Sequence, residues 1–174
     1  MLPKIAVIGN GYWGKNLVRN FHALGVLTYV CDSRVEALQN AHTQFGVNTC
    51  SSPETLLNNH EVQGVAIAAP AVQHYQLAKD CLLAGKDVYV EKPLALLVDQ
   101  GQELAEIAEN KHRILMVGHI LQYHPAIIKL KQLIGSGELG RIQYIYSSRL
   151  NWGKLRTEEN ILWSFAPHDI SAIL

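Results

Sequence analysis

Short runs of apolar, often β-branched residues alternate along this chain with longer segments whose apolar positions recur at helical spacing. That alternation is typical of βαβ units built around a parallel sheet. Glycine closes several of the longer segments, as the ends of helices commonly do. The predicted strands are 4–8, 27–31, 65–68, 87–90 and 114–117, and the predicted helices are 12–24, 34–45, a short one opening at 52–54, 73–84 and 99–110.

This order of segments predicts the α/β class with a doubly wound parallel sheet, the Rossmann architecture. We expect six strands with five intervening helical segments, which complete the domain by about Gly118. Residues 1–120 are therefore interpreted as one domain.

The pattern changes beyond this domain. A helix is predicted over 124–134, and residues 141–150 alternate apolar and polar positions, which predicts a strand in a half-exposed sheet. A polar loop then leads into 161–169, where we expect one or two helical turns. Because a single strand cannot bury a face by itself, we interpret residues 121–174 as the incomplete start of a second domain.

Composition narrows the possible partners. The formal net charge is zero and no Lys/Arg run stands out, so neither nucleic acid nor an anionic membrane is expected as a partner. The three cysteines, Cys31, Cys50 and Cys81, are odd in number and lack Cys-x-x-Cys spacing, which argues against a disulfide framework or a zinc site. No two histidines have metal-ligand spacing on a clear helix face, so no metal is assigned. Without a leader segment or a bilayer-length apolar run, we expect a cytoplasmic protein.

The first predicted strand runs into Gly9-Asn10-Gly11-Tyr12-Trp13-Gly14, which has the spacing of a dinucleotide-binding fingerprint. In such a turn Gly9 permits the tight bend, Gly11 lets a pyrophosphate approach the backbone, and Gly14 allows close packing of helix on strand. Amide groups at the helix start face the anion. We expect all six residues to line the cofactor site, with Trp13 packing in the core rather than stacking on a base. The alternative is a turn that serves packing alone.

Asp32-Ser33-Arg34 follows the second predicted strand, about twenty residues after the fingerprint. A carboxylate at Asp32 would bind the ribose hydroxyls of the dinucleotide and repel a 2′-phosphate, which favours NAD over NADP. Arg34 would contact such a phosphate if it swung inward; otherwise it is a solvated residue in the first turn of the next helix. Asp32 itself has the simpler alternative of capping that helix.

Glu91-Lys92-Pro93 places an ionisable amine at the carboxyl end of a predicted buried strand, the edge where open α/β sheets bind ligands. Pro93 restricts Lys92 to an extended conformation, which would hold the amine in one direction. Beside a nicotinamide, Lys92 would hydrogen-bond the reacting hydroxyl or help to take its proton. Glu91 would orient the amine. The alternative is a surface lysine and an ordinary charge at the end of a strand.

The chain resembles the Gfo/Idh/MocA family of NAD(P)-dependent oxidoreductases over essentially its whole length, which is roughly half that of family members. The resemblance rests on the fingerprint, on Pro70 with His74 opening the next helix, and on the step from Ala84-Gly85-Lys86 into Glu91-Lys92-Pro93. It implies a Rossmann domain followed by an α+β substrate domain with a mostly antiparallel sheet. It also implies that Lys92 is the active-site lysine, that its peptide bond to Pro93 is cis, and that Pro70, His74, Glu91 and Lys92 line the cofactor site.

The second half resembles a subgroup of that family. Gly118-His119, the segments 123–126 and 137–140, and above all 158–169 look like members acting on UDP-N-acetylglucosamine-derived sugars, among them UDP-N-acetylglucosaminuronate 3-dehydrogenases. In the wider family a helix carries Asp-x-x-x-His facing the nicotinamide. His168 matches the histidine of that motif, whereas Ser164 stands at the aspartate position, which leaves Lys92 and His168 as the proposed pair.

These features lead to one functional hypothesis with two alternatives. The hypothesis is an NAD-dependent dehydrogenase that oxidises a secondary alcohol of a nucleotide sugar, at C3, with Lys92 and His168 as acid/base residues in either order. Tyr123, Arg149 and Asn151 are candidate substrate contacts, and the family resemblance implies a homo-oligomer for the complete form. The alternatives are a family member that acts on inositol or another sugar, and a truncated chain that binds NAD without turnover.

Overall fold

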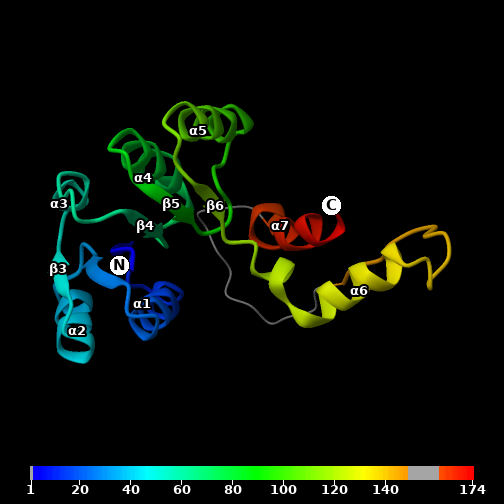
Figure 1. Ribbon diagram of the computed structural model, residues 1–174, viewed down its shortest axis with the longest axis horizontal. Helices are drawn as coiled ribbons and strands as arrows, with labels where there is room; N and C mark the ends of the chain where they lie inside the picture. The colour runs from blue at the N-terminus through cyan, green and yellow to red at the C-terminus, as the bar shows by residue number, and fades with distance from the viewer. Residues whose placement is uncertain (1, 149–160) are drawn as a thin grey trace. The chain divides into compact units, whose positions relative to one another are not determined.

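The computed structural model describes residues 2–148 and 161–174 (Figure 1). The chain divides into two compact units, Met1–Gly118 and His119–Leu174, and each is described by itself. None of the helices in the described residues is long and apolar enough to cross a membrane.

The first unit is built on one six-stranded, wholly parallel sheet with the order β3-β2-β1-β4-β5-β6. This is the strand order of the Rossmann fold, so the predicted doubly wound sheet is confirmed. The predicted strands reappear within one residue at each end, and β3 is the strand to which the sequence pattern assigned no range. The strands are β1 Ile5–Ile8, β2 Leu27–Cys31, β3 Asn48–Cys50, β4 Gly64–Ile67, β5 Asp87–Val90 and β6 Leu115–Val117.

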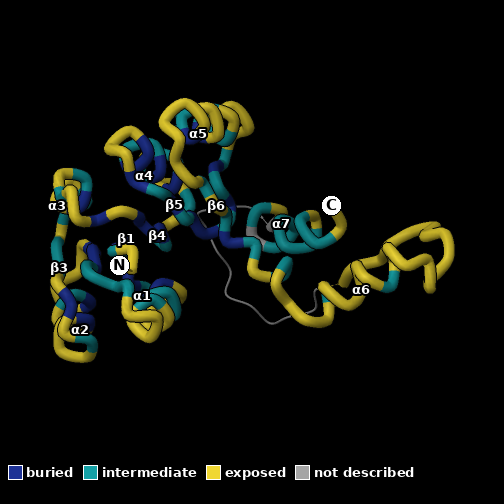
Figure 2. Tube along the Cα trace, viewed as in Figure 1, coloured by how far each residue is buried: buried dark blue, intermediate teal, exposed yellow. Residues whose placement is uncertain are grey.

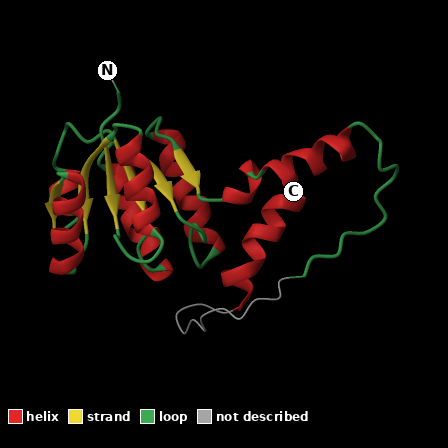
Figure 3. Ribbon diagram, turned by 90° about the horizontal axis from the view of Figure 1, so that it is seen from below, coloured by secondary structure: helices red, strands yellow, loops and turns green. Residues whose placement is uncertain are grey.

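Helices cover both faces of this sheet (Figure 3). Val7 of β1 belongs to a core that α1 and α2 close, whereas its neighbours Ala6 and Ile8 belong to a second core closed by α3, α4 and α5. Successive strand residues point to opposite faces, which explains why the central strands are apolar throughout and buried on both sides (Figure 2). The helices are α1 Gly14–Ala23, α2 Val35–Phe45, α3 Glu54–Leu57, α4 Ala71–Leu83 and α5 Val98–Asn110.

A buried lysine fixes the turn between α4 and β5. Lys86 is only 4% exposed, and its Nζ donates to the carbonyl oxygens of Asn59 (2.6 Å) and Val62 (2.9 Å) in the loop after α3. Desolvation lowers the pKa of this amine, and the two carbonyl acceptors offset the cost of burying it. The lysine thus ties the α3–β4 and α4–β5 connections together at the amino-terminal edge of the sheet.

The described part of the second unit combines helices with a non-helical segment, residues 136–148. It contains the 3₁₀ helix η1 Ile120–Tyr123, α6 Pro125–Gly135 and α7 Ile161–Ile173. α6 begins as predicted: Pro125 is its first residue, and Nδ1 of His124 accepts a hydrogen bond from the Ala126 amide at 3.2 Å. α7 is longer than the one or two turns predicted and continues through Pro167.

The strand predicted for residues 141–150 is wrong over its described part. Residues 141–148 form no strand. Alternation of apolar and polar residues favours a strand only when a neighbouring chain segment accepts its hydrogen bonds. Among the described residues of the second unit there is no other strand to serve as that neighbour.

Candidate functional site

Four of the parallel strands deliver the predicted site residues to one edge of the sheet. Because β1, β2, β4 and β5 all run in the same direction, the loops at their carboxyl ends share that edge. The chain leaves β1 toward one face and β4 toward the other, which makes this the switch point where such sheets bind ligands. The loops comprise Gly9–Trp13, Asp32–Arg34, Ala68–Pro70 and Glu91–Pro93.

The three fingerprint glycines meet different surroundings. Gly9 has a φ of +92°, and a Cβ there would lie 2.6 Å from the Ala68 carbonyl oxygen. A Cβ on Gly14 would lie 1.9 Å from the Gly9 carbonyl oxygen. At Gly11, by contrast, no atom of the described residues lies within 4 Å of an added Cβ. The protein's own packing therefore requires Gly9 and Gly14, whereas Gly11 borders open space.

Asp32 is a buried carboxylate with a full set of donors. Its Oδ2 accepts from the Asn10 amide (2.7 Å), and its Oδ1 accepts from the Arg34 amide (2.9 Å). Burial raises the pKa of Asp32, but the hydrogen bonds from Arg34 and Asn10 outweigh burial and leave that pKa below its ordinary value. Asp32 therefore stays ionised at neutral pH. One of its donors, the Asn10 amide, belongs to the fingerprint turn.

Arg34 covers the Asp32 carboxylate from the solvent side. Its Nε and Nη2 each donate to one carboxylate oxygen at 3.0 Å, and Nη2 also reaches the Asn10 carbonyl oxygen at 3.2 Å. The hydrogen bond to Asp32 raises the pKa of Arg34, which stays charged. Arg34 is the N-cap of α2 rather than a solvated residue of its first turn, although its side chain is 61% exposed. Ser33, between these two residues, is exposed.

Glu91 directly follows β5, with its carboxylate held inside the protein. The residue is 9% exposed, and its Oε1 accepts from Trp13 Nε1 (2.6 Å) and from the Tyr89 hydroxyl (2.8 Å). The expectation that Trp13 packs in the core is wrong, because this residue is 39% exposed and uses its indole N–H to reach Glu91. Tyr12, its neighbour in the fingerprint, is exposed. The turn after β1 and the end of β5 are therefore joined by a hydrogen bond that the sequence pattern did not predict.

Lys92 is half-buried, and its peptide bond to Pro93 is cis, as the family resemblance implies. The Pro93 carbonyl oxygen lies 2.7 Å from Nδ1 of His74, whose Nε2 lies 2.8 Å from the Ala69 carbonyl oxygen. His74 is 2% exposed. Its ring thus spans the loops after β4 and β5 and fixes the backbone next to Lys92. Pro70, predicted beside it, is the exposed N-cap of α4.

The remaining predicted residues belong to the second unit. His168 is half-buried within α7, and its carbonyl oxygen accepts from the Ser171 hydroxyl at 3.0 Å. Asp169 follows it inside the same helix. Tyr123 is exposed at the end of η1. Arg149 and Asn151 lie outside the described residues.

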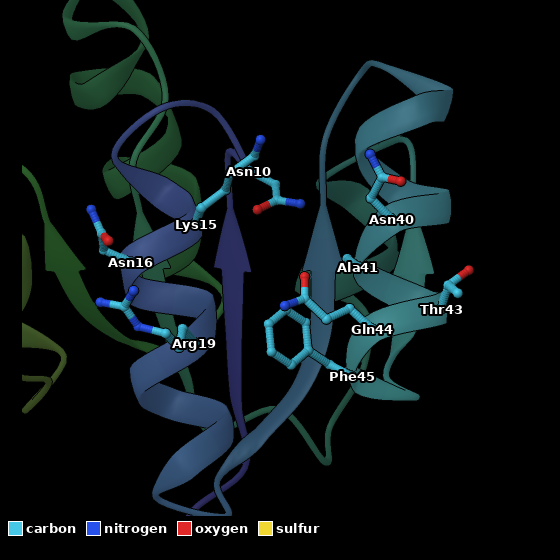
Figure 4. A pocket seen from close by; sticks show the side chains of 9 residues that line it. All are labelled: Asn10, Lys15, Asn16, Arg19, Asn40, Ala41, Thr43, Gln44 and Phe45. Atoms are coloured by element: carbon cyan, nitrogen blue, oxygen red, sulfur yellow. The ribbon is translucent and has the colours of Figure 1, made fainter.

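A cavity of about 410 Å³ lies between α1 and α2. In Figure 4, Gln44 and Phe45 extend from α2 into the space between the two helices, and Asn10 lies at its upper end. The amide Nδ2 of Asn10 donates to the Ala37 carbonyl oxygen at 2.9 Å, whereas its Oδ1 has no hydrogen-bond partner among residues 2–148 and 161–174. Apart from Asn10, no predicted site residue lines this cavity. In the described part of the chain, no group of three or more His, Cys, Asp or Glu residues could hold a metal ion.

Comparison with known proteins agrees with this geometry. The family described as "Oxidoreductase family, NAD-binding Rossmann fold" (Gfo/Idh/MocA) matches residues 3–119. UDP-N-acetylglucosamine 3-dehydrogenase of Acidithiobacillus ferrooxidans is 28% identical over 172 residues, which cover 98% of this chain and 53% of that protein. Inositol 2-dehydrogenase 2 of Saccharopolyspora erythraea is 29% identical over 163 residues, 88% of this chain and 47% of that protein.

A solved structure shows the same similarity. GenD2 from gentamicin A biosynthesis, in complex with NAD, superimposes with a TM-score of 0.75 at 27% identity, over 79% of this chain and 41% of GenD2. The chain therefore spans about half the length of the relatives that it matches.

Proposed function

This chain belongs to the Gfo/Idh/MocA family of oxidoreductases, and from that premise we propose that it is an NAD-dependent dehydrogenase of a nucleotide sugar, oxidising a secondary alcohol at C3. One observation carries the proposal: the fingerprint turn, the ionised Asp32 and the half-buried Lys92 share a single edge of the sheet. That arrangement suits a dinucleotide with a reacting alcohol beside it.

The fingerprint turn would hold the pyrophosphate. Gly11 leaves open space beside the backbone, and α1 begins at Gly14 with its first amides directed out of the helix. Asp32 would accept hydrogen bonds from the ribose hydroxyls. To do so it must exchange the Arg34 guanidinium for the ribose, and the exposure of Arg34 gives that side chain room to move away.

NAD is the proposed cofactor because a 2′-phosphate would meet the ionised carboxylate of Asp32. GenD2, a relative of similar fold, was crystallised with NAD. Arg34 is the residue through which a 2′-phosphate would be tolerated, since its guanidinium already lies at this carboxylate. The coarser conclusion, an NAD(P)-binding family, does not depend on this choice.

Lys92 is the proposed acid/base residue of the first unit. A bound nicotinamide would accept the hydride from the carbinol carbon. The hydroxyl proton would pass to Lys92 or His168, and the other residue would hydrogen-bond the oxygen as it becomes a carbonyl. The contact of His74 with the Pro93 carbonyl oxygen fixes the backbone on one side of Lys92, and the hydrogen bonds of the buried Glu91 fix it on the other.

The substrate proposal rests on the relatives. A UDP-N-acetylglucosamine 3-dehydrogenase matches nearly the whole chain, which favours a nucleotide sugar and its C3 hydroxyl. The second candidate is inositol, because an inositol 2-dehydrogenase matches at similar identity. A panel of UDP-N-acetylglucosamine, its uronate and myo-inositol, followed by NADH absorbance, separates the two. Turnover of inositol alone would overturn the nucleotide-sugar proposal.

Lys92→Ala tests the chemistry. We expect turnover to fall by at least about a hundredfold while the dissociation constant of NAD changes less than about threefold, because the lysine acts on the hydroxyl. Lys111→Ala, which alters an exposed lysine at the C-terminal end of α5, serves as the matched control and should keep turnover. Equal turnover of Lys92→Ala and the unaltered chain would reject the assignment. NAD binding without turnover of any substrate in the unaltered chain would instead favour an NAD-binding chain that lacks activity.

A further inference from the structure

Glu91 is a buried acidic residue of the site, and the proposed reaction gives it only a structural role. Glu91 precedes Lys92, and both donors that reach its Oε1, the Trp13 indole N–H and the Tyr89 hydroxyl, are neutral groups. Neither donor cancels the charge of a carboxylate. An ionised Glu91 would therefore carry an unneutralised negative charge within these contacts.

Three segments of the first unit fix where that charge lies. Trp13 belongs to the fingerprint turn and Tyr89 to β5, while Gly118 directly follows β6. A Cβ at Gly118 would lie 2.9 Å from Oε2 of Glu91 and 2.5 Å from the Tyr89 hydroxyl, so a side chain at this position would displace these two groups. The carboxylate thus has one well-defined position near the carboxyl ends of β5 and β6.

The position of Glu91 places it beside the nicotinamide half of a dinucleotide bound at this edge. If the fingerprint turn holds the pyrophosphate, the adenosine half lies on the β2 side, where Asp32 would accept hydrogen bonds from its ribose. The nicotinamide half then extends to the other side of the switch point, toward β4 and β5. Glu91 and Lys92 directly follow β5, so the carboxyl group of Glu91 lies on the nicotinamide side.

The nicotinamide ring is cationic when oxidised and neutral when reduced. A fixed negative charge nearby attracts the first form and is indifferent to the second, and the attraction is strongest where burial excludes water. We propose that Glu91 is a specificity-determining residue that makes the site bind oxidised NAD in preference to NADH. This inference rests on the proposed function, because it requires a nicotinamide cofactor at this edge of the sheet.

Glu91→Gln separates this role from a structural one. A glutamine side chain has the same shape, and its oxygen still accepts from Trp13 and Tyr89, so the contacts remain while the charge is lost. A residue that only anchors the fingerprint turn would, when altered, weaken both forms of the cofactor alike. A charge that selects the oxidised form changes the ratio of the two affinities.

The test is a calorimetric titration of the full chain with NAD⁺ and, separately, with NADH. For Glu91→Gln we expect the ratio of the dissociation constants, NAD⁺ over NADH, to rise roughly tenfold, the effect of one charge about 12 Å away at an effective dielectric constant of about 20. Glu61→Gln, an exposed carboxylate in the loop before β4, is the matched control and should leave the ratio unchanged. A ratio within about twofold of the unaltered chain in a folded Glu91→Gln protein overturns the inference.

The other outcomes are equally decisive. If the unaltered chain binds neither form, the proposed function fails, and the inference fails with it. If the chain binds both forms but Glu91→Gln leaves their ratio unchanged, only the inference fails. Should Glu91→Gln not fold, as judged by circular dichroism, Glu91→Asp and Glu91→Asn provide the same comparison. These two side chains are equally shortened and differ in charge, so the ratio should rise for Asn relative to Asp, and equal ratios would refute the role of charge.

Discussion

Gly11 and Gly14 illustrate how two residues of one motif differ in purpose. A side chain at position 14 would collide with the Gly9 carbonyl oxygen, whereas a side chain at position 11 would enter space that no described residue fills. If the fingerprint turn binds pyrophosphate, Gly11 serves the ligand and Gly14 serves the fold. The two roles predict different phenotypes.

Gly11→Ala is therefore expected to change the free energy of unfolding by less than about 1 kcal/mol, because its methyl group meets nothing in the protein. The same substitution should weaken NAD binding by about tenfold or more, since the methyl group occupies the pyrophosphate position. Urea denaturation and calorimetric titration measure the two effects. Gly14→Ala is the contrasting variant and should lose stability by more than about 2 kcal/mol. A Gly11→Ala chain with unaltered NAD affinity would place the pyrophosphate elsewhere.

At the same scale, the sequence predicted which residues lie at the candidate site, but it did not predict the hydrogen bonds that those residues make. Asp32 follows from its distance to the fingerprint and lies at the predicted edge. The Arg34 fork over Asp32 and the Trp13 bond to Glu91 do not follow from any pattern. Trp13 and Glu91 are 78 positions apart, so only the sheet order brings them together. From the sequence, Trp13 beside a fingerprint glycine is interpreted as core packing. Only the structure shows that its indole N–H donates to Glu91.

At the scale of elements, apolar periodicity predicted the strands that are buried on both faces. β1 and β4, which are buried almost throughout, lie within one residue of their predicted bounds, because such strands read as continuous apolar runs. β3, Asn48–Cys50, was missed since it has three residues and only one apolar member, and its pairing with β2 defines it. The segment 141–148 shows the opposite error. Alternation of apolar and polar residues is not sufficient to form a strand when no neighbouring strand pairs with it.

Lys86 gives an element-scale prediction that the sequence did not offer. Lys86→Ala should lower the free energy of unfolding by about 2–4 kcal/mol, because it leaves the Asn59 and Val62 carbonyl oxygens without their donor and opens a cavity between α4 and β5. Urea denaturation measures the change. Lys111→Ala, an exposed lysine at the end of α5, should change stability by less than about 0.5 kcal/mol. Comparable effects for both lysines would show that the buried amine does not stabilise this turn.

On the scale of the whole molecule, both hydrophobic cores belong to the first unit. All their buried members come before residue 119, and the four loops of the candidate site lie in the same unit. The alternation of segments predicted this doubly wound unit. The strand order itself, with β4 beside β1, could not be read from the pattern, because periodicity marks elements and not their neighbours.

Residues 1–118 alone are therefore expected to fold and to bind NAD with the affinity of the full chain, within about threefold. Circular dichroism during heating should show a cooperative transition for this fragment, and titration gives its dissociation constant. Turnover of any sugar should be absent, because His168 is missing. A fragment that is unfolded, or folded but unable to bind NAD, would show that the second unit takes part in the cofactor site.

The central claim is that this edge of the sheet holds NAD through the fingerprint turn and Asp32. Calorimetric titration of the unaltered chain and of Asp32→Ala with NAD⁺ tests it most directly. We predict saturable binding of one NAD⁺ per unaltered chain, and a loss of about tenfold or more for Asp32→Ala, which removes the acceptor for the ribose hydroxyls. Absence of NAD⁺ binding to the unaltered chain, or equal affinity of the two proteins, would contradict it.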